Sequence, residues 1–280
     1  MIKDITLGQY FPMDSLIHKL DPRAKLLFTL VFIVAAFVCN NFVSLFFCFV
    51  VSAMIIASSK IPLKTVTKGL KPIILIVVIT SVLQIAYVKT GVVLIDVWNI
   101  QITSGGILTA VFMALRISLL IVMSTMLTYT TSPTALTNGL DRVFAPFNKI
   151  GIDFHTVTMI MTIALRFIPT LIEEVDKIMS AQKSRGANFE QGSLIKRAKA
   201  LIPLFIPLLF NSIRRAYELA NAMTCRCYNG GKGKTTMNAL KYSSRDYFAT
   251  VFSFAVIGVV ILLNIYCGEY NAEFTFNSTV

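Results

Sequence analysis

The chain has 280 residues, of which 55% are hydrophobic and only 14% are charged, and its mean hydropathy is +0.72. A typical soluble domain carries about 25% charged residues, so this composition excludes an ordinary soluble protein and predicts helices that cross a membrane. The formal net charge of +12 is compatible with nucleic acid, anionic lipid or cytoplasmic loops, and the distribution of the basic residues decides among these.

Five apolar runs, none of which contains Asp or Glu, predict transmembrane helices. A hydrocarbon layer of about 30 Å takes about 20 mostly apolar residues, so the first run is short and needs its flanking residues or a tilt. The runs cover residues 26–39, 42–58, 72–88, 107–128 and 247–266.

The Lys and Arg residues orient these runs, because cytoplasmic loops carry an excess of them. With a cytoplasmic N-terminus, 24 of the 26 Lys and Arg residues lie on the cytoplasmic side, which favours loops over nucleic acid as their explanation. The predicted organisation is a cytoplasmic N-terminal segment (1–25), a four-helix transmembrane region (26–130), a cytoplasmic domain (131–245), a last transmembrane helix (246–267) and an extracellular tail (268–280).

The segment 131–245 predicts three long cytoplasmic helices. The first begins at Ser132-Pro133, with Ser as N-cap and Pro at the first helical position. The second covers about 153–184 and has one apolar stripe. The third covers about 194–226, and its apolar stretch is too short to span a bilayer, so it lies at the membrane interface or packs against other helices. The polar face of the second helix carries Arg166, Glu173, Glu174, Asp176, Lys177 and Lys183.

Prolines interrupt the last two of these helices. Each proline lacks a backbone N–H, so we expect helix kinks at Pro169, Pro203 and Pro207.

The sequence lacks the constellations typical of catalysis or of a metal site. The loop from Gly230 to Thr235 has Tyr228 where a phosphate-binding loop needs its first glycine. His18 and His155 have no partners at metal-ligand spacing, so we interpret both as polar interface residues. The predicted spans also contain no acids, which intramembrane proteases and proton relays require. We therefore expect no enzyme activity, no cofactor and no metal.

Arg116 is the one charged residue inside a predicted span. A charge at this depth costs about 2.5–3.5 kcal/mol, so its side chain is expected to face the bundle interior or another subunit. Two interpretations stay open: contact with a partner subunit or cavity, and an internal bond to a Ser, a Thr or a carbonyl.

Two arginines flanked by small residues lie at predicted helix ends. Ser184-Arg185-Gly186 ends the second cytoplasmic helix and Cys225-Arg226-Cys227 ends the third. A guanidinium can bind a carboxylate through two hydrogen bonds, and small neighbours let a partner surface approach closely. The pattern alone leaves two interpretations open: a paired docking device, and arginines that only complement the helix dipoles.

Several ordered motifs extend from residue 8 to about 260. They are Gly8-Gln9-Tyr10, His18-Lys19-Leu20-Asp21-Pro22-Arg23-Ala24-Lys25-Leu26, Arg116, Thr131-Ser132-Pro133, Leu140-Asp141-Arg142, Leu165-Arg166-Phe167-Ile168-Pro169, Glu173-Glu174, Ala181-Gln182-Lys183-Ser184-Arg185-Gly186 and Ala222-Met223-x-x-Arg226-x-Tyr228. In these motifs the chain resembles the transmembrane T-component of energy-coupling factor (ECF) transporters, the EcfT/CbiQ-like family.

The resemblance implies a function. Members of the family couple two cytoplasmic ABC-type ATPases to a small substrate-binding membrane subunit, the S-component, in the uptake of a vitamin or a metal ion. By this resemblance Arg185 and Arg226 dock into the two ATPases, which hydrolyse the ATP, and the chain lies in a prokaryotic cell membrane. The second motif departs from the family's small-Arg-Gly form, which leaves open whether Cys227 takes the backbone geometry of a glycine.

A function of another class competes with this one. A membrane scaffold or receptor could use the basic cytoplasmic helices to bind lipid headgroups or a soluble protein. It predicts salt-sensitive lipid binding and no ATPase partner.

Overall fold

A computed structural model describes residues 10–97, 100–146, 153–187, 189, 194–229 and 242–276. The chain divides into two compact units. We call residues 8–139 and 240–280 the bundle unit, and residues 140–239, with the segment 1–7, the crossed-helix unit. Helix α6 (Pro133–Phe144) belongs to both, because the boundary falls between Gly139 and Leu140.

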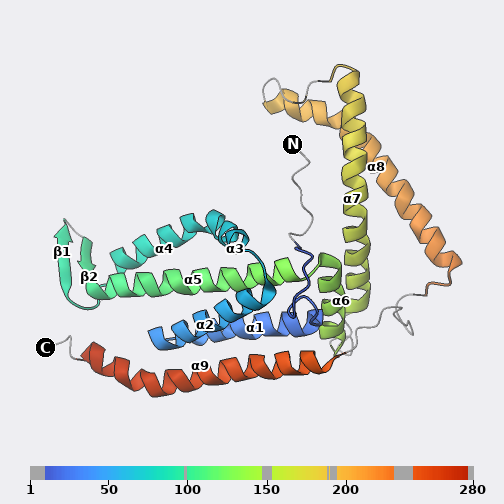
Figure 1. Cartoon of the computed structure of the whole chain (residues 1–280). Helices are drawn as coiled ribbons and strands as arrows, with labels where there is room; N and C mark the ends of the chain where they lie inside the picture. Colours follow the sequence, from blue (N-terminus) through green and yellow to red (C-terminus); the bar gives the residue numbers. More distant parts are fainter. Residues whose placement is uncertain are drawn as a thin grey trace. The chain divides into compact units, whose positions relative to one another are not determined.

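The bundle unit confirms the predicted all-α class. Its helices, drawn in Figure 1, are α1 (Pro22–Val38), α2 (Phe42–Ser59), α3 (Leu63–Leu70), the 3-10 turn η1 (Lys71–Ile73), α4 (Ile74–Tyr87), α5 (Ser104–Thr130) and α9 (Ser244–Phe276). A short antiparallel hairpin, which the sequence pattern did not predict, lies between α4 and α5. It pairs β1 (Val93–Val97) with β2 (Ile100–Thr103).

Five segments of the described chain are helical, long and apolar enough to cross a membrane. They are Phe42–Ser59, Leu63–Tyr87, Ser104–Thr130, Phe154–Ser184 and Ser244–Cys267. Four of these coincide with predicted runs, and the helix around the run 72–88 begins earlier, at Leu63. The run 26–39 falls in α1, which has only 17 residues. Helix α7 (Phe154–Ser184), which we predicted to be cytoplasmic, also meets these length and composition criteria.

The core of the bundle unit lies between α1, α2, α5 and α9. Phe32, Leu119 and Val260 are buried there beside side chains of small volume. Small residues let helix backbones approach closely in a membrane, where lipid is as apolar as leucine and burial alone does not drive association. The small residues fully buried in this cluster are Ala35, Ala36, Cys39 and Cys48.

Asn264, within α9, joins the end of α1 to the start of α2 at one end of this core. Its amide nitrogen, on α9, donates to the carbonyl of Val38 at the end of α1. Its amide oxygen accepts from the backbone N–H of Asn40 at 3.3 Å and from the hydroxyl of Ser44, on α2, at 2.9 Å. These bonds satisfy backbone groups that a helix end leaves without intrahelical partners.

Lys25 joins helix ends at the other end of the core. The Lys25 amine donates to the carbonyl of His18 at 3.1 Å and to that of Thr130, the last residue of α5, at 2.9 Å. Beside it, the carboxylate of Asp246 on α9 accepts from the backbone N–H of Asp21 at 2.8 Å. Burial, and then the positive charge of Lys25, lower the pKa of His18.

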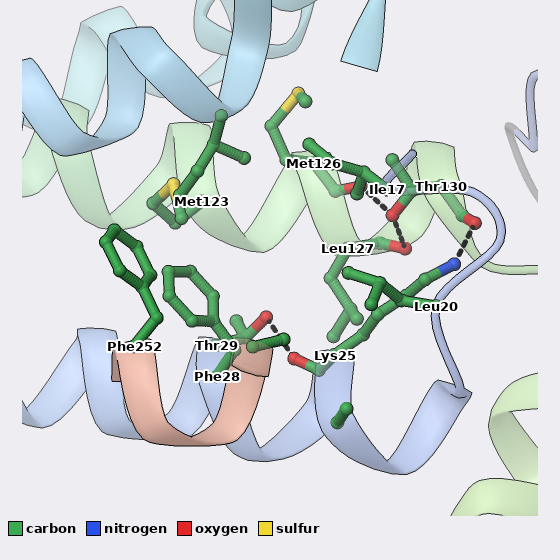
Figure 2. Close-up of a pocket in the computed structure, with 13 residues that line it drawn as sticks. Ile17, Leu20, Lys25, Phe28, Thr29, Met123, Met126, Leu127, Thr130 and Phe252 are labelled. Atoms are coloured by element: carbon green, nitrogen blue, oxygen red, sulfur yellow. Dashed lines mark hydrogen bonds between the residues drawn. The ribbon is translucent and has the colours of Figure 1, made fainter. Parts of the chain in front are cut away.

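A small apolar cavity of about 130 Å³ lies next to Lys25. Figure 2 shows its lining, with the rings of Phe28 and Phe252 on one side and the Lys25 amine directed at the Thr130 carbonyl. The amine therefore binds backbone oxygens rather than facing the cavity.

The crossed-helix unit consists mainly of two long helices. They are α7 and α8 (Leu194–Cys225). Asp153 caps the start of α7, because its carboxylate accepts from the backbone N–H and the hydroxyl of Thr156. These hydrogen bonds lower the pKa of Asp153. Figure 1 shows α7 nearly straight and α8 bent, and the two helices cross.

Replacement of Lys25 by methionine tests the role of its amine. Lys25→Met leaves two carbonyls without a donor, so we expect a loss of about 2–4 kcal/mol in the free energy of unfolding. Thermal unfolding in detergent micelles measures the effect. Lys19→Met is the control, because the Lys19 side chain is 58% exposed. Equal unfolding temperatures for the two variants would contradict the assignment.

Candidate docking site

Arg185 is held at the end of α7 by a complete C-terminal cap. The backbone N–H of Gly186 donates to the carbonyl of Lys183 at 3.0 Å, and that of Ala187 donates to Gln182 at 3.0 Å. This pair of bonds defines the Schellman motif, which requires a left-handed residue just after the helix. Gly186 supplies it with φ of +84°, and a side chain there would enter open space.

Arg226 occupies the equivalent position at the end of α8. The backbone N–H of Cys227 donates to Thr224 at 2.9 Å, and that of Tyr228 donates to Met223 at 3.0 Å. Cys227 is left-handed, with φ of +59°. The second motif therefore takes the glycine geometry although it has a cysteine, which answers the question that the sequence left open.

The two arginine side chains are exposed. Within the part of the chain that the structure describes, neither guanidinium has an ion-pair or hydrogen-bond partner. The neighbours Ser184, Gly186, Cys225 and Cys227 are exposed as well, so neither motif is covered by its own unit. Each arginine is thus free to bind a carboxylate, while its charge complements the negative end of its helix.

The structure does not bring the two motifs into contact. Helices α7 and α8 cross, and Figure 1 shows their C-terminal ends at opposite ends of the pair. Two separate contact points of the same geometry suit two separate partner surfaces better than one.

A charged contact joins α7 to α8. Oε1 of Glu174 accepts from the side-chain amide of Asn211 at 2.6 Å, and Oε2 pairs with the guanidinium of Arg215 at 3.0 Å. The sequence analysis placed Glu174 on the polar face of its helix together with Glu173. The structure corrects this placement, because only 14% of the Glu174 side chain is exposed. No sequence signal shows which face of α7 meets α8.

Asp141 joins α6 to the start of α7. It accepts from the hydroxyl of Thr158 at 2.7 Å and lies 3.1 Å from Nδ1 of His155. The ring of Phe144 stacks on that of Phe154, with centroids 5.0 Å apart. His155 is therefore a polar interface residue, as its lack of metal-ligand partners indicated. His18 has a similar place, with Nδ1 2.6 Å from the hydroxyl of Ser15.

Arg116 makes an internal bond. Its guanidinium donates to the carbonyl of Cys39 and lies over the ring of Phe112, 4.7 Å from the centroid. The bond links α5 to the end of α1. Contact with a partner subunit stays a prediction.

Each of the three prolines lies inside a helix. Pro169 interrupts the hydrogen bonds of α7, and Pro203 and Pro207 interrupt those of α8. The bend expected in α8 is visible in Figure 1, whereas α7 is nearly straight there, so the kink expected at Pro169 is not seen. The loop from Gly230 to Thr235 lies outside the described residues.

Comparison with known proteins decides the family. A family profile described as cobalt transport protein, CbiQ, matches residues 13–237, which include both arginine motifs. A relative named energy-coupling factor transporter transmembrane protein EcfT, from Clostridium kluyveri, is 47% identical over 270 residues, which is 96% of this chain and 100% of the relative. The chain belongs to this family.

Other relatives agree along nearly the whole chain. EcfT of Ruminiclostridium cellulolyticum is 45% identical over 266 residues, 94% of this chain and 98% of the relative. EcfT of Thermosediminibacter oceani is 45% identical over 250 residues, 89% of this chain and 94% of the relative. As an EcfT protein, the chain is a multi-pass membrane component of a transporter and not itself a catalytic subunit.

The two caps are expected to respond oppositely to substitution. A side chain in the left-handed region costs about 1–2 kcal/mol, part of which is offset by the entropy that glycine loses on folding. Gly186→Ala should therefore speed amide hydrogen exchange in the last turn of α7 by about fivefold, a change of about 1 kcal/mol. Cys227→Gly should slow exchange in the last turn of α8. Faster exchange in Cys227→Gly would contradict the left-handed assignment.

Proposed function

We propose that this EcfT protein is the coupling subunit of an importer. It transmits the ATP-driven motion of two cytoplasmic ABC-type ATPases to a small substrate-binding membrane subunit, which takes up a vitamin or a metal ion. The observation that carries the proposal is the pair of equivalent helix ends, each with an exposed arginine at the same position of the same cap. Two helix ends of the same geometry are suited to bind two ATPases of similar structure.

The chemistry of the helix ends favours an acidic groove on each ATPase. Arg185 and Arg226 each present a planar guanidinium that can bind a carboxylate with two hydrogen bonds. Their small neighbours leave room for the partner backbone. A negative groove would also interact with the positive side chain before contact, which speeds association.

The outer surface of α8 favours a contact with the substrate-binding subunit or the bilayer surface. Large apolar side chains are between 48% and 69% exposed there. Exposure of such a surface to water is unfavourable, and exposed apolar patches typically mark sites that bind a protein or a membrane. ATP binding would move the two ATPases and with them the ends of α7 and α8, and would shift this surface against the membrane subunit. The residues are Leu201, Phe205, Ile206, Phe210 and Tyr217.

We further propose that the N-terminus and residues 131–245 are cytoplasmic and that the C-terminus is extracellular. The basic residues support this orientation, since 24 of 26 then lie inside. Helix α7 is long enough to span, but its second half carries Glu173, Asp176 and Lys177, which a lipid-exposed span would hold at high cost.

Labelling of the native cysteines tests the orientation. Cys225 and Cys227 are exposed, so a membrane-impermeant maleimide should label them in inverted vesicles and not in intact cells. The chain is expressed without ATPases and carries Cys267→Ser, while a variant that also carries Cys225→Ser and Cys227→Ser gives the background signal. Labelling in intact cells above that background would overturn the orientation.

Purification from native membranes tests the proposed function. The tagged chain, extracted in mild detergent, is expected to bring down two ABC-type ATPases and at least one small hydrophobic protein, identified by mass spectrometry. The ligand bound to the small protein identifies the transported substrate. Recovery of the chain alone, under conditions that preserve other membrane complexes, would contradict the coupling function.

The same preparation tests the docking arginines. Arg185→Ala and Arg226→Ala should each weaken ATPase binding by about 2–4 kcal/mol, as arginines at the centre of an interface do. The control is Lys199→Ala, because Lys199 is exposed on the N-terminal part of α8. Unchanged ATPase recovery and unchanged transport in the double arginine variant would reject the assignment.

A further inference from the structure

The Glu174 carboxylate holds two residues of α8 that lie one helical turn apart. Asn211 and Arg215 are separated by four residues, so both face the carboxylate from one side of α8. The side chains of Glu174 and Arg215 are 14% and 34% exposed. A charge-assisted pair that is shielded in this way contributes more than an exposed ion pair.

The contact lies at equal distances from the two docking arginines. Arg185 follows Glu174 by eleven residues, and Arg226 follows Arg215 by eleven residues. At a rise of about 1.5 Å per residue, each arm between the contact and its arginine is roughly 16 Å long.

Both arms are continuous helix without a helix-breaking residue. Residues 175–184 and 216–225 contain no proline and no glycine. The prolines lie on the other side of the contact, with Pro169 five residues before Glu174 and Pro207 four residues before Asn211. Helix bends concentrate at prolines. Bending at these sites therefore does not disturb the contact at Glu174 or the two arms that follow it.

We propose that Glu174, Asn211 and Arg215 form a clamp that fixes the separation of the two docking arginines. The clamp makes the two arms one rigid body, so that a displacement of either helix end also moves the other end. The helices bend at the prolines to accommodate this movement. The three residues are positioning residues that act through Arg185 and Arg226. The identity of what docks rests on the proposed function, whereas the fixed separation does not.

The separation can be measured in the full-length chain without partners. Spin labels are attached at Ala181→Cys and Ala222→Cys, both exposed positions on the arms. Cys225, Cys227 and Cys267 are replaced by serine, and the buried Cys39 and Cys48 remain. Electron–electron resonance should give one narrow distance distribution. Glu174→Ala should reduce the population at that distance roughly tenfold, as expected when a buried charged group loses its hydrogen bonds.

The neighbouring residue offers a matched control. Arg214 pairs with Glu218 within α8 at 3.3 Å and is 79% exposed, so Arg214→Ala should leave the distribution unchanged while Arg215→Ala broadens it. Rescue by the charge swap Glu174→Arg with Arg215→Glu should restore a narrow distribution. A narrow and unshifted distribution in both Glu174→Ala and Arg215→Ala would overturn the clamp.

A second measurement separates positioning from folding. In the assembled complex, Glu174→Ala should keep both ATPases bound, because Arg185 and Arg226 are intact, and should reduce the substrate transported per ATP hydrolysed. Wild-type coupling in this variant would overturn the clamp and leave docking by the arginines in place. Failure of the wild-type chain to bind ATPases would reject the proposed function, and the distance measurement would still decide whether the clamp exists.

Discussion

Hydrogen bonds between helix ends are the interactions on which the bundle unit depends. Lipid is as apolar as leucine, so burial alone gives neighbouring helices little preference for one another. The amine of Lys25 and the carboxylate of Asp246 hold the starts of α1 and α9 beside the end of α5, and Asn264, within α9, binds the end of α1 and the start of α2. Between these points small residues allow close packing. The polar bonds set which ends meet, and the small residues set how closely the helices lie.

Helix α6 connects this bundle to the crossed helices. Gly139 packs against Pro22, where an added Cβ would lie 3.1 Å from the proline ring, so the first part of α6 is fixed to α1. Two residues later, Asp141 binds His155 and Thr158 at the start of α7. A single short helix therefore makes contacts within each of the two units.

Local signals in the sequence were sufficient for the helices and for two of their caps. The apolar stripe, Ser132 and Gly186 predicted where α6 and α7 begin or end, because N-caps and left-handed glycines act within one turn of chain. The role of Glu174 was not predictable, because the sequence pattern of a charged helix face is the same whether its carboxylate is solvated or paired with Arg215. The hairpin at Val93–Thr103 was missed because its two strands are only five and four residues long and lie between two predicted spans. The earlier start at Leu63 was missed because Lys64, Lys68 and Lys71 interrupt the apolar pattern before residue 72.

The geometry of Cys227 shows which property of the two motifs is constrained. A non-glycine residue in the left-handed region costs about 1–2 kcal/mol, and helix ends that do not need this turn avoid the cost. Here the two motifs differ in all residues that flank the arginine, yet their caps have the same hydrogen bonds and the same handedness. Strain of this kind persists where surrounding structure or function requires it. The conformational cost of this cap is smaller than the few kcal/mol that one central arginine contributes to an interface. The strained cap holds Arg226 in the same position as the Gly186 cap holds Arg185, so the free energy gained on binding a partner exceeds the cost.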